Sequence, residues 1–289
     1  MKKNIALLLG LVLGLGFVSC SSDDDNDDEY TNGEGKYLAE MQTTRYDWKD
    51  GKRSNEGKPF QLIRYDKEGR YIGEDNFRSG HRTEIIFDDN GDRIEERVYD
   101  LNNLKSLISS YKYEYNYEDL SYVVYGYNWK GNLVITYIRE FDNAKNLIKH
   151  TEVIDSIGKD YGTIRTYSYS GNVETIDVSK LKDGSFSERI VHEEDSHGYI
   201  IKTTVTYNNG PTTTSEYINE YDSNGRLLKR TGPIYNNSVN YGYTEYTYND
   251  DGTVKKTHTV NVYNPIPGVS NAERKEEFDL EYTYKYKKK

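Results

Sequence analysis

Residues 221–227 read Tyr221-Asp222-Ser223-Asn224-Gly225-Arg226-Leu227, and this phrase decides the fold that the sequence predicts. An aromatic residue ends one strand, and an Asp side chain caps the turn. The glycine then takes a left-handed conformation that other residues resist, and a branched residue begins the returning strand. The phrase therefore predicts a β-hairpin.

Copies of this phrase recur along the chain, and neighbouring copies are separated by about one strand plus one turn, or by two such units. Clear copies occupy residues 65–71, 87–94, 127–133 and 248–254, and weaker ones occupy residues 46–52, 141–147, 167–173 and 192–200. Between them, aromatic and polar residues alternate with the period of a half-buried strand, as in residues 111–117. The pattern predicts consecutive antiparallel hairpins, each of which buries its face against its neighbours.

Tyrosine dominates the apolar content of the chain. The sequence holds 30 Tyr against 7 Phe and 2 Trp, and only 35% of its residues are hydrophobic. Few aliphatic side chains are left to build one thick core, whereas the apolar ring and polar hydroxyl of Tyr suit a half-solvated sheet. We therefore expect an all-β fold: an extended, twisted, Tyr-rich antiparallel sheet that can curl partly on itself and so protect its edges.

The first residues predict export. Two lysines precede a short apolar run that ends at Phe17-Val18-Ser19-Cys20, so residues 1–19 have the order of a secretory signal. The last four positions resemble the lipobox of bacterial lipoproteins, with Phe17 where that family usually has Leu. The resemblance implies that Cys20, the single cysteine, is lipidated and anchors the chain to a membrane. An ordinary secretory signal that happens to contain a cysteine is the alternative.

Residues 20–36 form an acidic stretch after that cysteine, and we expect a disordered tether there. The stretch resembles the export signal of surface-exposed lipoproteins in the Bacteroidota. This resemblance implies an outer-membrane location, lipid-anchored and facing the cell exterior. A calcium site is the alternative for these carboxylates.

The remaining residues, 37–289, are similar to a known repeat family. Residues 221–228 resemble a YD repeat, the unit of Rhs and teneurin-like proteins, and looser copies cover most of the domain. Large members of that family wrap a β-sheet into a shell around a toxin or other cargo. This chain is too short for that and looks more like the small YD-like lipoproteins of Bacteroidota, many of which have no assigned function.

Composition and motifs argue against several functions. The formal net charge of −10 makes a nucleic-acid partner unexpected. We find no phosphate loop, dinucleotide fingerprint or nucleophile elbow, and we predict no cofactor and no enzymatic activity. An unrecognised hydrolase that uses a pair of carboxylates is left open.

Two segments have some likeness to metal sites. His192 and His197 flank a run of acidic residues, which would suit zinc, but the segment also matches the hairpin phrase. Residues 88–92 have the look of a calcium loop without its glycine and distant glutamate. We interpret both as turns and predict no metal site.

Trp48 and Trp129 each occupy the third place of a copy of the phrase. An indole exposed at a hairpin tip would stack on a sugar ring or anchor a protein partner, and Tyr127 would lie beside Trp129. Alternatively, each indole folds back onto a neighbouring hairpin. Asp155-Ser156-Ile157 resembles the O-glycosylation signal of exported Bacteroidota proteins, which makes Ser156 a candidate for modification.

The sequence thus favours a surface lipoprotein that is a non-catalytic binding module for a glycan or a protein partner. The alternative is a structural role, as an adhesin-like spacer or a subunit of an envelope assembly. In that case the tyrosines would serve only cross-strand packing.

Overall fold

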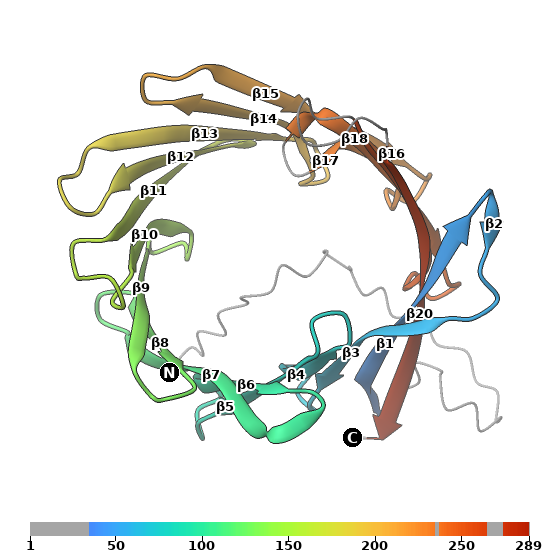
Figure 1. Cartoon of the computed structure of the whole chain (residues 1–289), viewed down its shortest axis with the longest axis horizontal. Coiled ribbons are helices and arrows are strands. Elements are labelled where there is room, and N and C mark those ends of the chain that lie inside the picture. The colour runs from blue at the N-terminus through green and yellow to red at the C-terminus, as the bar shows by residue number, and fades with distance from the viewer. Residues whose placement is uncertain (1–34, 235–236, 265–273, 289) are drawn as a thin grey trace. The chain divides into compact units, whose positions relative to one another are not determined.

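The computed structural model describes residues 35–234, 237–264 and 274–288. These residues form 20 strands and no helix, and the strands pair in antiparallel fashion, so the predicted all-β hairpin fold is confirmed (Figure 1). Accordingly, the described residues include no helix with the length and hydropathy that a membrane crossing requires. The predicted signal peptide, Cys20 and nearly all of the predicted tether lie outside the described residues.

The chain divides into two compact units, and four strands contribute residues to both. Unit 1 comprises residues up to 108, 245–259 and 277–289, and unit 2 comprises residues 109–244 and 260–276. The strands shared between them are β7 (Asn103–Asn116), β18 (Asn237–Tyr248), β19 (Val254–Tyr263) and β20 (Arg274–Lys288).

Unit 1 joins segments from both ends of the described chain. The last strand, β20, pairs with the first from Lys36 opposite Lys288 to Asp47 opposite Phe278. The first strand also pairs with β3, and the remaining strands follow as hairpins in chain order. Its own strands are β1 (Lys36–Lys49), β2 (Lys52–Arg53), β3 (Lys58–Tyr65), β4 (Tyr71–Asn76), β5 (His81–Phe87) and β6 (Arg93–Asp100).

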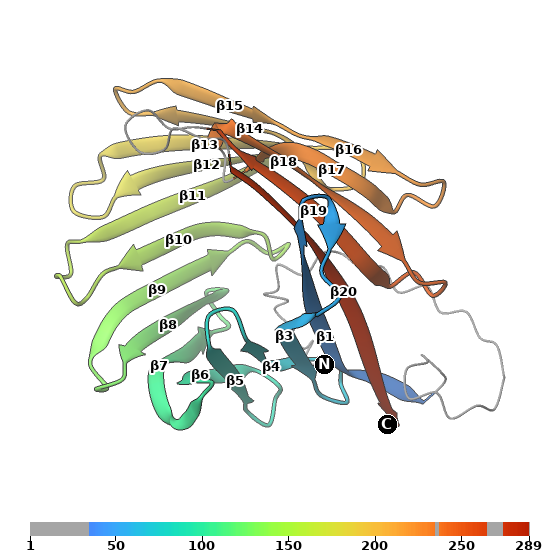
Figure 2. The same cartoon turned by 45° about the vertical axis from the view of Figure 1, so that its right-hand side comes forward.

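Unit 2 is a meander in which β7 to β15 lie side by side in chain order (Figure 2). The next hairpin pairs β16 with β17. Its own strands are β8 (Ser121–Asn128), β9 (Leu133–Phe141), β10 (Leu147–Val153), β11 (Gly162–Ser170), β12 (Val173–Lys180), β13 (Phe186–Glu194), β14 (Ile200–Tyr207), β15 (Thr212–Glu216), β16 (Ile218–Tyr221) and β17 (Leu227–Ile234).

Five copies of the recurring phrase fold as the sequence predicts. At residues 66–70, Oδ1 of Asp66 accepts hydrogen bonds from the backbone N–H groups of Glu68 (3.0 Å) and Arg70 (2.9 Å). The glycine between them, Gly69, has a φ of 79°, which is costly for residues that carry a Cβ. The same two bonds recur at Asp88, Asn128, Asp195 and Asp222. Each of these five copies is therefore a stiff, side-chain-capped turn.

Tyrosines pack across the strands of unit 2. Cross-strand register puts Tyr113 opposite Val124 and Tyr115 opposite Tyr122, so these side chains share one face, which we call the tyrosine face. Tyr122 is 2% exposed; its ring stacks on that of Phe141 with centroids 5.7 Å apart and lies 5.5 Å from that of Tyr115. Such aromatic cross-strand pairs stabilise a sheet that lacks a thick aliphatic core.

Candidate functional site

Exposed apolar side chains line one end of unit 2. Antiparallel order brings the connections β8–β9, β10–β11, β12–β13 and β14–β15 to the same end of the sheet, along the left of Figure 2. We call this end the Trp129 edge. The large hydrophobic residues there are Trp129, Ile157, Tyr161, Phe186 and Tyr207, whose side chains range from 38% to 66% exposed. Successive connections at this end are separated by two strand spacings, which is about 10 Å. The row can therefore contact an extended ligand at several points.

Trp129 is the most exposed of these side chains, at 66%. Its turn is held by Oδ1 of Asn128, which accepts hydrogen bonds from the N–H groups of Lys130 (2.9 Å) and Asn132 (3.1 Å). The ammonium of Lys130 lies 4.8 Å from the centre of the indole ring system. A capped turn thus presents a large aromatic surface to solvent, with a cation beside it.

The β10–β11 connection is also fixed to the sheet. The hydroxyl of Thr136 donates to Oδ2 of Asp155 (2.7 Å), and the N–H of Ser156 donates to the carbonyl of Val134 (3.2 Å). These contacts leave the Ser156 side chain exposed, next to Ile157 at 61%. Glycosylation of Ser156 stays a prediction, and its acceptor hydroxyl belongs to the same edge as Trp129.

Tyr127 precedes the Trp129 turn by one residue and lies on the face opposite the tyrosine face. It pairs with Ser110, and the ammonium of Lys112 is 5.7 Å from the centre of its ring. Tyr127 is half-buried, so it offers less ring surface than Trp129. The structure therefore places both residues on one hairpin, with the larger exposed surface at the tip.

Trp48 has a different environment, although its sequence context resembles that of Trp129. Asp50 and Gly51, with φ of 51° and 73°, close a two-residue turn, so β1 continues through Lys49 and pairs Trp48 with Arg53. The indole is half-buried, and its ring is edge-on to His258 at 5.3 Å between centroids. Trp48 thus folds back onto His258 of β19, within unit 1.

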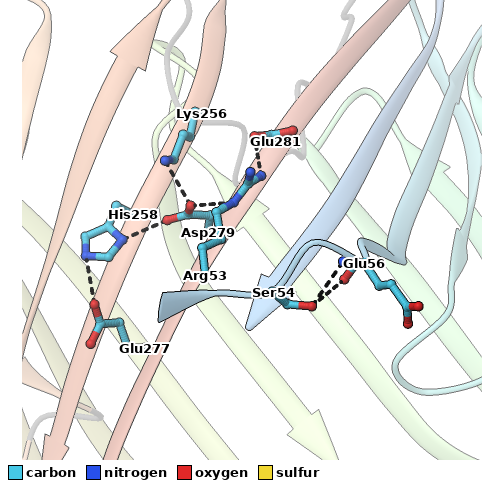
Figure 3. Close-up of polar contacts among 8 residues, drawn as sticks. All are labelled: Arg53, Ser54, Glu56, Lys256, His258, Glu277, Asp279 and Glu281. Atoms are coloured by element: carbon cyan, nitrogen blue, oxygen red, sulfur yellow. Dashed lines mark hydrogen bonds and ion pairs between the residues drawn. The ribbon is translucent and has the colours of Figure 1, made fainter. Parts of the chain in front are cut away.

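His258, the ring partner of Trp48, belongs to an ion-pair network that the sequence did not predict. Figure 3 shows this network. Its centre is Asp279 on β20, which is 0% exposed. Nζ of Lys256 and Nε of Arg53 are each 2.9 Å from Oδ2, and Nδ1 of His258 is 2.7 Å from Oδ1. Arg53 also pairs with Glu281. The network ties the β1–β2 hairpin to β19 and β20.

Electrostatics keep Asp279 charged. Burial raises the pKa of its carboxyl, but hydrogen bonds from Lys256 and His258, together with the Lys256 charge, outweigh burial and hold the pKa below its usual value. Nε1 of Trp48 is close enough to add to this lowering, although it forms no hydrogen bond of good geometry. The cations that surround the carboxylate occupy the positions a ligand would need, so we interpret the network as structural.

The histidines considered for zinc have other contacts. Nδ1 of His192 lies 2.9 Å from the hydroxyl oxygen of Thr203, and His197 stacks on Tyr221 with ring centroids 4.0 Å apart. Among the described residues, no three His, Cys, Asp or Glu side chains gather closely enough to hold a metal ion.

No family model matches the chain, and no curated protein sequence matches it significantly. Solved structures do resemble it. A porin-like protein from Bacteroides uniformis has a TM-score of 0.46 at 14% identity over 86% of this chain and 96% of its own. A porin-like protein from Bacteroides vulgatus gives 0.34 at 13% identity over 83% and 97%. The Tc holotoxin pore of Photorhabdus luminescens gives 0.22 at 12% over 75% and 16%. At these scores the likeness carries no argument about function.

Proposed function

We propose that this protein is a non-catalytic glycan-binding module whose ligand lies along the Trp129 edge. The observation that carries the proposal is the row of exposed apolar side chains at that edge, led by the 66% exposed indole of Trp129. Indole and phenol rings offer large, rigid contact surfaces at low entropic cost. The faces of sugar rings, which carry C–H groups, are suited to stack on them.

The geometry of the edge fits a chain-like ligand. Successive contact points belong to separate connections of one sheet, so they are held at fixed spacing before the ligand arrives. Hydroxyls and charges stand between the apolar groups, among them Ser156 and Lys130. A ligand with alternating apolar faces and hydroxyl edges would satisfy both kinds of group.

The remaining features of the proposal derive from the sequence. We propose that Cys20 carries the lipid, that residues 20–36 hold the domain away from the outer membrane, and that the domain faces the cell exterior. The resemblance to YD-repeat lipoproteins of Bacteroidota supports this arrangement, as does the acidic stretch after Cys20.

A protein partner from an envelope assembly is the second candidate. It is favoured by the same exposed residues, because contiguous apolar patches also mark protein interfaces. The two candidates differ in their predictions. A glycan-binding edge retains affinity for isolated polysaccharides, whereas an assembly subunit co-purifies with an envelope protein and binds no sugar.

Affinity electrophoresis tests the proposal. Residues 20–289 with Cys20→Ser, which cannot be lipidated, would be run through gels that contain host or dietary polysaccharides. We expect retardation in at least one gel, and loss of that retardation in Trp129→Ala. Tyr117→Ala is the matched control, because Tyr117 is 51% exposed but belongs to the β7–β8 turn at the opposite end of unit 2.

Free migration of the unmutated protein through every gel would refute glycan binding and would leave the assembly subunit as the better candidate. Equal loss of retardation in Trp129→Ala and Tyr117→Ala would show that the Trp129 edge is not the site.

A further inference from the structure

A row of basic side chains crosses the tyrosine face of unit 2. In the register of β9, β10 and β11, His150 stands directly opposite Arg139 on one side and Arg165 on the other. Directly paired residues of neighbouring strands point to the same face of a sheet. The three side chains therefore lie next to one another, with the imidazole between two guanidinium groups.

Both guanidinium charges act on the imidazole. Burial, together with the charges of Arg139 and Arg165, lowers the pKa of His150 to about 4. His150 is therefore neutral at physiological pH, and the row carries the two arginine charges alone. The same two charges also reach the hydroxyls of Tyr137 and Tyr167 on this face, so all five groups are close together.

Several polar atoms of this region lack a partner. Nε of Arg139, Nε2 of His150 and the hydroxyl of Thr163 are buried, and none forms a hydrogen bond within the described part of the chain. Arg139 uses only Nη1, which donates to the hydroxyl oxygen of Tyr122 (2.6 Å). Buried polar groups without partners are rare in folded proteins, and each one calls for a physical explanation.

Several arginines elsewhere on the strands pair with carboxylates. Arg82 forms two hydrogen bonds to Asp75, and Arg189 forms two to Asp177. In the described residues, no carboxylate lies within ion-pair distance of Arg139 or Arg165.

Acidic residues do share the tyrosine face. Glu152 pairs with Tyr137 across β9 and β10, and Glu174 raises the pKa of Tyr167 together with burial. Neither carboxylate reaches the two arginines closely enough to pair with them. The two half-buried guanidinium groups are therefore left without a carboxylate partner in the described part of the chain.

We propose that Arg139, His150 and Arg165 form a binding site for the oxyanion group of an acidic sugar, a carboxylate or a sulfate. Each planar guanidinium can donate two parallel hydrogen bonds to such a group. The neutral imidazole of His150 stands between the two guanidinium groups, and the ring of Tyr137, edge-on to His150 at 5.6 Å, borders the site. This site goes beyond the proposed function, because it lies on the tyrosine face and needs no residue of the Trp129 edge.

Isothermal titration calorimetry of residues 20–289 with Cys20→Ser tests the site. The probes are polygalacturonate, which carries carboxylates, chondroitin sulfate, which carries sulfates as well, and the neutral polysaccharide dextran. We expect binding of at least one acidic probe, weakened by added sodium chloride, and no binding of dextran at this site. Arg139→Gln and Arg165→Gln should each lower the affinity for the acidic probe about tenfold or more.

Arg189→Gln is the matched control, since Arg189 belongs to the opposite face and already has a carboxylate partner. Arg139→Lys and Arg165→Lys keep the charge but cannot donate two parallel hydrogen bonds from one planar group. Their affinity for the acidic probe should fall between that of the unmutated protein and that of the Gln variants. Circular dichroism checks that each variant is folded.

Two results would overturn the proposal. One is that no acidic probe binds the unmutated protein. The other is that affinity survives in the double variant of Arg139 and Arg165, or falls equally in Arg189→Gln. If acidic affinity falls in Trp129→Ala and not in the arginine variants, this site is refuted while the proposed function stands.

Discussion

Replacing Asp279 with asparagine tests whether the buried ion-pair network stabilises unit 1. The substitution keeps the shape of the side chain and removes its charge. Lys256, Arg53 and His258 then surround a neutral amide, in a site where Asp279 was 0% exposed. Removing one partner of a buried ion pair costs about 3–5 kcal/mol. Side chains of Lys256 and Arg53 are 34% and 33% exposed and can partly rehydrate, so we expect about 3 kcal/mol, at the lower end of that range.

Asp177→Asn is the control for this prediction. Asp177 pairs with Arg189, whose side chain is 54% exposed, and such surface pairs contribute about 1 kcal/mol or less. Urea denaturation would measure the free energy of unfolding of both variants, followed by fluorescence of Trp48 beside the network. Equal destabilisation by the two substitutions, or a loss below about 1 kcal/mol for Asp279→Asn, would refute the stabilising role.

The contribution of Asp279 also has a defined pH window. The folded-state pKa is lowered from 3.8, so the folded protein binds fewer protons than the unfolded chain as pH approaches that value. The stabilisation is fully present above pH 3.8 and is lost as pH falls through the lowered pKa. The difference in stability between the unmutated protein and Asp279→Asn should therefore shrink only in strong acid.

Three further substitutions have expected outcomes. Since His150 has a pKa of about 4, lowered from 6.5, the folded protein should lose up to about 3 kcal/mol as pH falls through that interval, and urea midpoints of His150→Gln should lack this loss. Gly162→Ala would place a Cβ 1.8 Å from the carbonyl oxygen of Glu152, so thermal unfolding should report at least about 2 kcal/mol of destabilisation. Tyr284→Phe removes the hydroxyl that donates to the Val254 carbonyl at 2.7 Å, and should cost about 1–2 kcal/mol in urea titrations. A loss in His150→Gln equal to that of the unmutated protein would contradict the role given to His150. Unchanged stability of Gly162→Ala or Tyr284→Phe would contradict the role given to the corresponding contact.

The turns are the part of the fold that the sequence predicts best. A side-chain cap and a left-handed glycine are local, so residues 66–70, 88–92, 128–132 and 195–199 form the same hydrogen bonds as residues 222–226. Where Lys145 stands in the place of the glycine, the backbone still adopts a φ of 70°, because Asp142 caps that turn in the same way. Consecutive hairpins follow from these turns without any long-range information.

Pairing between distant segments could not be predicted. The pairing of β20 with β1 joins opposite ends of the described chain, and no local signal specifies it. The sequence does indicate that Lys256 and His258 share one face of a strand, and that Glu277 and Asp279 share one face of another. It does not reveal that those faces meet, so the buried network became visible only in the structure.

The two tryptophans illustrate a second limit of prediction from the sequence, because similar local sequences place them in different environments. Both follow an Asx residue in the phrase, but the Asp50-Gly51 pair closes its own hairpin and carries Trp48 into a strand. Similarly, the row of Arg139, His150 and Arg165 depends on register. The shift between Leu147 and Lys149 sets which residues of β10 face β9, and a shift of one residue would put His150 on the other face.

Fluorescence quenching tests the central claim, ligand binding at the Trp129 edge, most directly. In Trp48→Phe, Trp129 is the sole tryptophan, and acrylamide should quench its 66% exposed indole strongly. Each polysaccharide of the electrophoresis panel would be added in turn. We predict that at least one protects Trp129 from quenching at the concentration where it retards the protein. Retardation with no change in quenching would contradict the claim, because the ligand would then bind away from the exposed indole.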